Sequence, residues 1–289
     1  MQKFKKIYVE ITNVCNLKCS FCGGTKKKEE FMDIRFFGEI LEKIKGRAPH
    51  LCLHVMGEPL MHPEIGSLMD LCEKYSFKVN LATNGTMMNE LKNIMHKPAL
   101  RQVSFSLHSS DEAADKESME RYAAPVFDFA GEAAAAGVLI SLRLWNLRED
   151  EAELNSNIIG MIEKKYPQAA PVDKKETRVN GINLAKNIFL SQAERFVWPA
   201  LEAPETGGRA FCLGLRDQIA VLADGTVVPC CLDANGIMAL GNIREKGFEE
   251  ILTGKRARKI YDGFSAKKAV EPLCAKCGYR SRFRRKAEM

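Results

Sequence analysis

The chain has 289 residues, of which 46% are hydrophobic and 28% charged, and its formal net charge is +6. These fractions are those of an ordinary globular protein with one large domain, alone or with a small appendage. No segment approaches the roughly 18 consecutive apolar residues of a membrane span, and the basic N-terminus lacks a signal-peptide core. We therefore expect a cytoplasmic protein with no membrane partner.

Strand-like and helix-like stretches alternate through the first two thirds of the chain. Hydrophobic periodicity predicts strands at about 6–11, 51–55, 79–82, 103–107, 138–144 and 182–190. Helices are predicted over 33–46, from about 63, through the alanine-rich stretch that ends at Ala136, and around 154–162. Repeated strand–helix units imply parallel strands with right-handed crossovers, so we expect an α/β fold that is a barrel or part of one.

The alternating pattern ends around residues 191–209, where prolines and glycines indicate a linker. Beyond it, two apolar runs, 218–222 and 226–228, flank Asp224-Gly225, which is a strong signal for a β-hairpin. We therefore expect two domains, residues 1–190 and residues 191–289.

Polar residues recur where the predicted strands end, namely Glu58, Asn84, His108 and Arg143. The carboxyl ends of parallel barrel strands meet at one rim, and active sites assemble there. His108 is the one candidate catalytic side chain, although a histidine at a strand end often only packs there, with its ring nitrogens hydrogen-bonded.

Three cysteines follow the first strand in the spacing C-x3-C-x2-C: Cys15, Cys19 and Cys22. Three thiolates at this spacing can each bind one corner of a cubane [4Fe–4S] cluster, which leaves the fourth iron open to bind and reduce another molecule. A structural zinc site or a disulfide pair is the alternative, but the next His or Cys, His50, lies far along the chain. In a reducing compartment, cysteine spacing indicates metal ligation rather than disulfides.

Cys15, Cys19, Phe21 and Cys22 match position by position the C-x3-C-x-aromatic-C signature of the radical S-adenosylmethionine (radical SAM) enzymes, which this sequence resembles. The resemblance implies a partial (β/α)6 TIM-like barrel. It also implies that S-adenosylmethionine is reductively cleaved to a 5′-deoxyadenosyl radical, with electrons from a reducing partner such as flavodoxin or ferredoxin.

The C-terminal cysteines resemble the auxiliary-cluster domain called SPASM or its shortened form, Twitch, a small domain with a β-hairpin plus helix. The resemblance implies a second, auxiliary [4Fe–4S] cluster with four ligands: Cys212, Cys230, Cys274 and Cys277. Cys231 is a rival to Cys230, because adjacent strand residues point to opposite faces. A structural zinc site of four cysteines is the alternative.

The resemblance also implies a set of S-adenosylmethionine contacts, which are Phe21 in the cysteine motif and, at the strand ends, Gly57, Glu58, Asn84, Ser106 and Arg143. A carboxylate at Glu58 suits the methionine ammonium group. Arg143 lies in an otherwise apolar strand, and a buried arginine needs an anion, either the methionine carboxylate or an internal Asp or Glu.

We expect hydrogen-atom abstraction from a peptide or a small organic substrate, with net oxidation assisted by the auxiliary cluster. The alternatives are a small-molecule dehydrogenase, a nucleobase- or nucleoside-processing lyase, an RNA-modifying enzyme, and a non-catalytic iron–sulfur electron carrier. RNA is suggested only by two basic runs, 255–259 and 280–286, which are more typical of a solvated helix face and a frayed tail. Only fourteen residues precede Cys15, which disfavours an N-terminal leader-peptide-binding domain.

Overall fold

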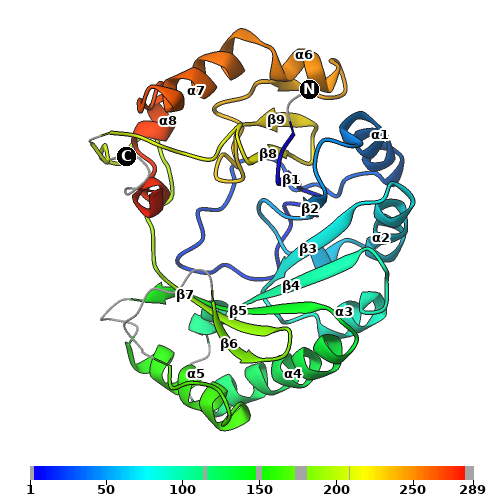
Figure 1. Cartoon of the computed structure of the whole chain (residues 1–289), viewed down its shortest axis with the longest axis vertical. Coiled ribbons are helices and arrows are strands. Elements are labelled where there is room, and N and C mark those ends of the chain that lie inside the picture. The colour runs from blue at the N-terminus through cyan, green and yellow to red at the C-terminus, as the bar shows by residue number, and fades with distance from the viewer. Residues whose placement is uncertain (1–2, 113–115, 148–151, 173–180, 208, 284–289) are drawn as a thin grey trace.

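The computed structural model describes residues 3–112, 116–147, 152–172, 181–207 and 209–283. Their strands form one ten-stranded sheet in the order β10-β9-β8-β1-β2-β3-β4-β5-β7-β6. Figure 1 shows this sheet curving around the interior of the molecule, with the helices on its outer side. The strands are β1 (Lys6–Val9), β2 (His50–Cys52), β3 (Lys78–Thr83), β4 (Leu100–Ser106), β5 (Leu139–Leu147), β6 (Ile182–Ala185), β7 (Ile188–Glu194), β8 (Gln218–Val221), β9 (Thr226–Val228) and β10 (Gly241–Asn242).

Parallel pairings join the six strands β1, β2, β3, β4, β5 and β7 of the barrel in this order, which confirms the predicted partial α/β barrel. The predicted single strand over 182–190 is wrong. It is an antiparallel pair, β6 and β7, that turns at Asn187, whose φ is +64°. Asparagine tolerates this left-handed conformation better than most residues, because its short polar side chain bonds locally.

The helices of the barrel are α1 (Ile34–Ile44), α2 (Ile65–Lys74), α3 (Met88–Ile94), α4 (Lys116–Ala135) and α5 (Ala152–Lys165). The Asp33 side chain caps α1 by accepting hydrogen bonds from the amides of Arg35 and Phe36. The short helix α3 was not among the predicted elements. Two 3₁₀ segments, η1 (Pro59–Met61) and η2 (Leu107–Glu112), follow strand ends.

Strand β5 illustrates how the sheet separates its two faces. Ile140, Leu142 and Leu144 are buried in the core cluster that includes the barrel helices. Because side chains alternate along a strand, Arg143 and Trp145 face the opposite side, the barrel interior. The same alternation places polar residues of other strands, such as Ser106, on the inner face.

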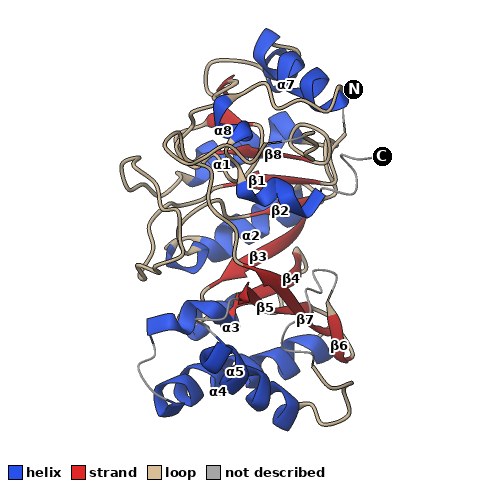
Figure 2. Ribbon diagram, turned by 90° about the vertical axis from the view of Figure 1, so that its left-hand side faces the viewer, coloured by secondary structure: helices blue, strands red, loops and turns tan. Residues whose placement is uncertain are grey.

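The C-terminal segment extends the barrel sheet. Strand β8 pairs in parallel with β1, and β8 and β9 form the predicted hairpin around Asp224-Gly225. Behind it come α6 (Phe248–Leu252), α7 (Lys255–Ser265), α8 (Pro272–Ala275) and η4 (Gly278–Phe283). Figure 2 shows α7 and α8 at the end of the molecule opposite α4 and α5. Strand β7 runs four residues past the expected domain boundary at residue 190, and the division into two domains stays a prediction.

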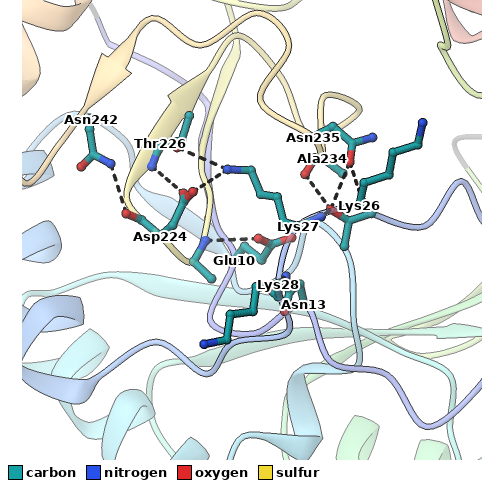
Figure 3. A network of polar contacts seen from close by, with 12 residues as sticks. Glu10, Asn13, Lys26, Lys27, Lys28, Asp224, Thr226, Ala234, Asn235 and Asn242 are labelled. Carbon is teal, nitrogen blue, oxygen red and sulfur yellow. Dashed lines mark hydrogen bonds and ion pairs between the residues drawn. The ribbon is translucent and has the colours of Figure 1, made fainter.

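A polar network joins the loop after β1 to the C-terminal hairpin (Figure 3). Lys27 pairs with Asp224 in the hairpin turn, and the Lys26 amide donates to Asn235 Oδ1 at 2.7 Å. Glu10 accepts from the amide of Ala223 at 3.1 Å and from that of Met56 at 3.1 Å. The end of β1 is therefore fastened to both of its neighbouring strands. In the part of the chain described here, no helix is long and apolar enough to cross a membrane.

Candidate functional site

The cysteine triad lies on an extended loop that leaves β1 at the carboxyl rim of the barrel. Cys15 and Cys22 are exposed and Cys19 is half-buried. The Cys22 amide donates to the Cys19 carbonyl at 3.0 Å, which closes a tight turn between these two ligand candidates. The Cys22 thiol lies 3.9 Å from the Met56 sulfur atom, so the loop approaches the end of β2.

Gly57 fits closely under the start of this loop. Its φ is +76°, and a Cβ atom there would lie 2.7 Å from the carbonyl oxygens of Thr12 and Val14. The next amide, that of Glu58, donates to the Val14 carbonyl at 2.8 Å. Only glycine combines this backbone conformation with such a close approach, so Gly57 fixes the position of the backbone just before Cys15.

Glu58 is almost completely buried, with 1% of its surface exposed. Its carboxylate caps η1 by accepting from the Leu60 amide at 3.1 Å and accepts from the Asn84 amide at 2.7 Å. Burial nevertheless raises the pKa of Glu58 to about 7, because these hydrogen bonds offset only part of the cost of desolvating the charge. The Thr83 side chain also hydrogen-bonds to Glu58, so of the roughly four lone-pair sites of a carboxylate about one remains for a further donor.

Asn84 links the end of β3 to the triad. Its Nδ2 donates to Asn16 Oδ1 at 2.9 Å and lies 3.9 Å from the Cys15 thiol. The Tyr122 hydroxyl on α4 donates to the Asn84 carbonyl at 2.7 Å. Neither Asn16 nor Tyr122 was among the predicted site residues. Asn16 lies inside the cysteine motif and could have been predicted from it, whereas only the fold brings Tyr122 to this rim.

Ser106 and Arg143 are directly paired residues of β4 and β5. Arg143 points across the barrel interior toward Tyr8, Cys52, Cys231 and Tyr279, and burial lowers its pKa. Its guanidinium carbon lies 4.8 Å from the centre of the Trp145 ring. No Asp or Glu among the described residues forms an ion pair with Arg143, which was the internal alternative weighed for its partner.

Phe21 and His108 meet at the rim with ring centres 4.7 Å apart. His108 is buried, and its Nδ1 lies 3.1 Å from the Arg143 carbonyl oxygen. Burial lowers the pKa of His108 to about 4, so its ring is neutral at pH 7. Trp198 donates from Nε1 to the Phe21 carbonyl at 3.0 Å. Nothing in its local sequence indicates this contact with the triad loop.

The second set of cysteines surrounds a cavity in the C-terminal region. Its walls include the four predicted ligands, Cys212, Cys230, Cys274 and Cys277, together with apolar residues and Arg280. Burial raises the pKa of the Cys277 thiol to about 11 and also raises those of the other three. Within the described residues, no three Cys, His, Asp or Glu side chains are close enough to share a single metal ion.

Cys230 and Cys231 lie in the turn that follows β9, and their side chains point to different surroundings. Cys230 lines the cavity with the other three cysteines. Cys231 instead packs in the barrel interior against Tyr8 and Cys52. Of the two rivals, the geometry favours Cys230 as the fourth ligand.

The basic C-terminal run departs from the expected frayed tail. Arg280 is buried and donates to the Ala275 carbonyl at 3.2 Å. Arg282 packs its guanidinium on the rings of Trp145, Phe196 and Tyr279. Both side chains turn inward because the cavity wall and the aromatic rings bury their stems. Residues 284–286 of the run lie outside the described residues, and in the other run Arg256 pairs with Glu271.

A partial α/β barrel with a cysteine triad beyond its first strand, extended by a hairpin segment with a second set of cysteines, defines an enzyme that uses S-adenosylmethionine and iron–sulfur clusters for radical chemistry. The chain belongs to the radical SAM superfamily, whose family model matches residues 9–155. Residues 212–278 match SPASM, an iron–sulfur cluster-binding domain.

Three known proteins illustrate the similarity. The tungsten-containing aldehyde ferredoxin oxidoreductase cofactor-modifying protein of Pyrococcus furiosus is 23% identical over 96% of this chain and 88% of its own. The crystal structure of BtrN in complex with AdoMet and 2-DOIA has a TM-score of 0.56 at 17% identity, covering 96% of this chain and 94% of BtrN. That of Streptococcus suis SuiB bound to precursor peptide SuiA has a TM-score of 0.63 at 14% identity, covering 96% of this chain and 70% of SuiB.

Proposed function

We propose that this enzyme cleaves S-adenosylmethionine reductively at the cysteine triad and abstracts a hydrogen atom from an organic substrate held in the barrel interior. The observation that carries the proposal is the convergence of Cys15, Asn84 and Glu58 at one rim, beside an exposed loop with two further thiols. A [4Fe–4S] cluster with S-adenosylmethionine, when bound at Cys15, Cys19 and Cys22, supplies the 5′-deoxyadenosyl radical that removes the hydrogen atom.

The chain's own residues would orient the cofactor. The remaining lone-pair site on Glu58 accepts a hydrogen bond from the methionine ammonium, while Gly57 holds the backbone of the triad loop close to Glu58. Asn84 positions Cys15 and reaches toward the same space. Phe21 covers the rim, Ser106 contributes a hydroxyl from the inner face of β4, and Arg143 is the candidate for the methionine carboxylate.

The C-terminal cavity fits an auxiliary cluster rather than a lone ion. Cys212, Cys230, Cys274 and Cys277 surround a space instead of converging on a point. Four thiolates close a cluster to substrate, so the role that remains is electron transfer with net oxidation of the substrate. Flavodoxin or ferredoxin is the proposed electron donor to the enzyme.

The substrate is a small organic molecule or a peptide. The cofactor-modifying relative from Pyrococcus furiosus and BtrN, crystallised with 2-DOIA, favour a small molecule, and both match along most of their length. The peptide candidate is favoured by the likeness to SuiB, crystallised with its precursor peptide. His108 lies beside Phe21 at the rim and is the candidate to contact substrate.

The test is made on the anaerobically reconstituted enzyme reduced with dithionite. We expect 5′-deoxyadenosine to form from S-adenosylmethionine, and deuterium from a labelled substrate to appear in it. An enzyme that is reduced and fully loaded with iron but forms no 5′-deoxyadenosine would be an electron carrier, and the proposal would then be wrong.

A further inference from the structure

Two arginines and two aromatic rings form a compact group in the barrel interior, here called the interior arginine group: Arg143, Trp145, Tyr279 and Arg282. The guanidinium carbons of Arg143 and Arg282 lie 4.8 and 4.7 Å from the centre of the Trp145 ring. Arg282 also lies 4.7 Å from the Tyr279 ring. Each of the four residues keeps part of its surface exposed.

No carboxylate of the described residues balances the positive charge of this group. Neither Arg143 nor Arg282 forms an ion pair with a carboxylate of the described residues. Arg282 donates from Nη2 to the Glu194 carbonyl at 3.1 Å, while its buried Nη1 has no partner in the described parts of the chain. A partly desolvated guanidinium with free donors is costly unless an anion completes its shell.

The group also lies between the two cysteine sites. Tyr279 lines the C-terminal cavity that contains Cys277. On the other side, the carbonyl of Arg143 contacts His108, whose ring packs on Phe21 in the triad loop. A ligand held here has one cysteine site on each side, as the proposed hydrogen abstraction followed by electron transfer requires.

We propose that the interior arginine group binds an anionic group of the substrate, a carboxylate or a phosphate, with Trp145 and Tyr279 packing on an adjoining planar part. Guanidinium groups pair with both oxyanions through two parallel hydrogen bonds, and aromatic faces suit flat ligands. This inference rests on the proposed function and narrows its substrate to small anionic molecules that carry a flat, unsaturated portion.

The test is isothermal calorimetry on the reconstituted holoenzyme saturated with S-adenosylmethionine. Two pairs of probes differ only in the anion: guanosine monophosphate against guanosine, and naphthalene-2-carboxylate against naphthalene-2-methanol. We expect at least one anion to bind about tenfold or more tightly than its neutral partner, and the pair that does so identifies phosphate or carboxylate. No preference in either pair would overturn the inference.

Variants test whether these arginines cause the preference for the anionic probe. Arg282→Gln should reduce this preference to about twofold or less, and Arg143→Gln should do the same. Because two variants are used, the test still holds if one of them misfolds. The matched control is Arg216→Gln, because Arg216 packs on Phe211 and Tyr261 outside the barrel interior. A preference that survives in a folded Arg282→Gln enzyme would equally overturn the inference.

Formation of 5′-deoxyadenosine without added substrate separates this inference from the proposed function. A wild-type enzyme that forms it but shows no anion preference contradicts only the substrate class. An enzyme that forms none contradicts the proposed function, and a measured anion preference then still establishes the binding site. Titration of the Arg143→Gln enzyme with S-adenosylmethionine decides independently whether Arg143 also binds the methionine carboxylate.

Discussion

The two cysteine sites differ in how much of each the chain encloses. Cys15, Cys19 and Cys22 come from one loop, and two of them are exposed. Cys212, Cys230 and the pair Cys274 and Cys277 come from three separate segments and line a cavity. A loop with three thiols leaves one side of a cluster open to a ligand, whereas four thiols around a cavity close it. The difference in enclosure corresponds to the difference between binding a cofactor and passing an electron.

The surroundings of the two sites differ in the same sense. Beside the triad lie polar side chains, such as Glu58 and Asn84. The C-terminal cavity has mostly apolar walls and one buried cation, Arg280. Apolar walls and a fixed positive charge shift the reduction potential of a cluster bound in the cavity, while the polar groups at the open rim orient a ligand of the triad cluster.

The largest expected effect comes from removing one cysteine of the N-terminal triad, the open site. Cys22→Ala should lower 5′-deoxyadenosine formation more than about 10³-fold, because two thiols cannot hold a cubane with one open corner. Iron analysis should show a loss of about half the metal, with the C-terminal cluster retained. Cys72→Ala, which removes a core thiol from α2, is the control for cysteine removal as such. A Cys22→Ala enzyme with undiminished iron would contradict the assignment.

A second variant pair tests the closed site. Cys230→Ala should remove the auxiliary cluster and about half of the iron, while S-adenosylmethionine cleavage without substrate persists within about tenfold. Cys231→Ala should keep both clusters, because Cys231 faces Tyr8 in the barrel interior. Electron paramagnetic resonance of the reduced enzymes distinguishes these outcomes. If the auxiliary cluster were lost in Cys231→Ala but kept in Cys230→Ala, the fourth ligand would be Cys231 and not Cys230.

Gly57 tests whether the open site depends on backbone fit. Gly57→Ala should destabilise the protein by about 2–4 kcal/mol, because a strained φ and a backbone clash add. Gly24→Ala should cost only about 1 kcal/mol, since Gly24 has φ +59° but no atom within 4 Å of its added Cβ. Denaturant unfolding of both variants gives the comparison. Equal losses would mean that strain alone, and not the contact with Thr12 and Val14, matters.

The smallest effect is a pH dependence at Glu58. Because the carboxyl must ionise to pair with an ammonium group, S-adenosylmethionine affinity should rise by about tenfold between pH 6 and 8, through the raised pKa of about 7. Glu58→Gln should bind more weakly and show a flat profile. A wild-type profile without slope would count against the ammonium contact.

The raised pKa of Glu58 has the opposite effect on the stability of the fold, which falls as the pH rises. The unfolded carboxyl ionises near its ordinary value of 4.5 and the folded one near 7, so the folded state retains its proton longer. The Glu58 contribution to stability is therefore full below pH 4.5 and is lost as the pH rises to 7. Urea unfolding of wild type and Glu58→Gln at pH 5 and 7.5 measures this difference.

Local signals in the sequence predicted most of the barrel and both cysteine sets. Alternating hydrophobicity located five of the six parallel strands, and Asp224-Gly225 located the hairpin. The turn at Asn187 was missed because a short apolar run looks the same whether or not it reverses direction. The sequence also could not predict which of Cys230 and Cys231 faces the cavity, because both lie in the turn after β9 and the conformation of that turn decides it.

Contacts between residues far apart in the chain could not be predicted from the sequence. Arg282 was expected to lie in a basic tail, but it packs on Trp145 of β5. Trp198 follows a lapse in the strand pattern, yet it holds the Phe21 carbonyl in the triad loop. Residue type and spacing carry no information on such pairs, because only the closed fold brings them together.

The pairing of β1 with β8 has a consequence for biosynthesis. Lys6 lies opposite Gln218 in the register of these two strands, so β1, the first strand to be synthesised, can pair with β8 only after most of the chain has been made. Until then, β1 presents a free edge, and contacts so distant in the chain slow folding. We expect nascent chains that stop before β8 to be cleaved rapidly by added protease, and full-length chains to resist it.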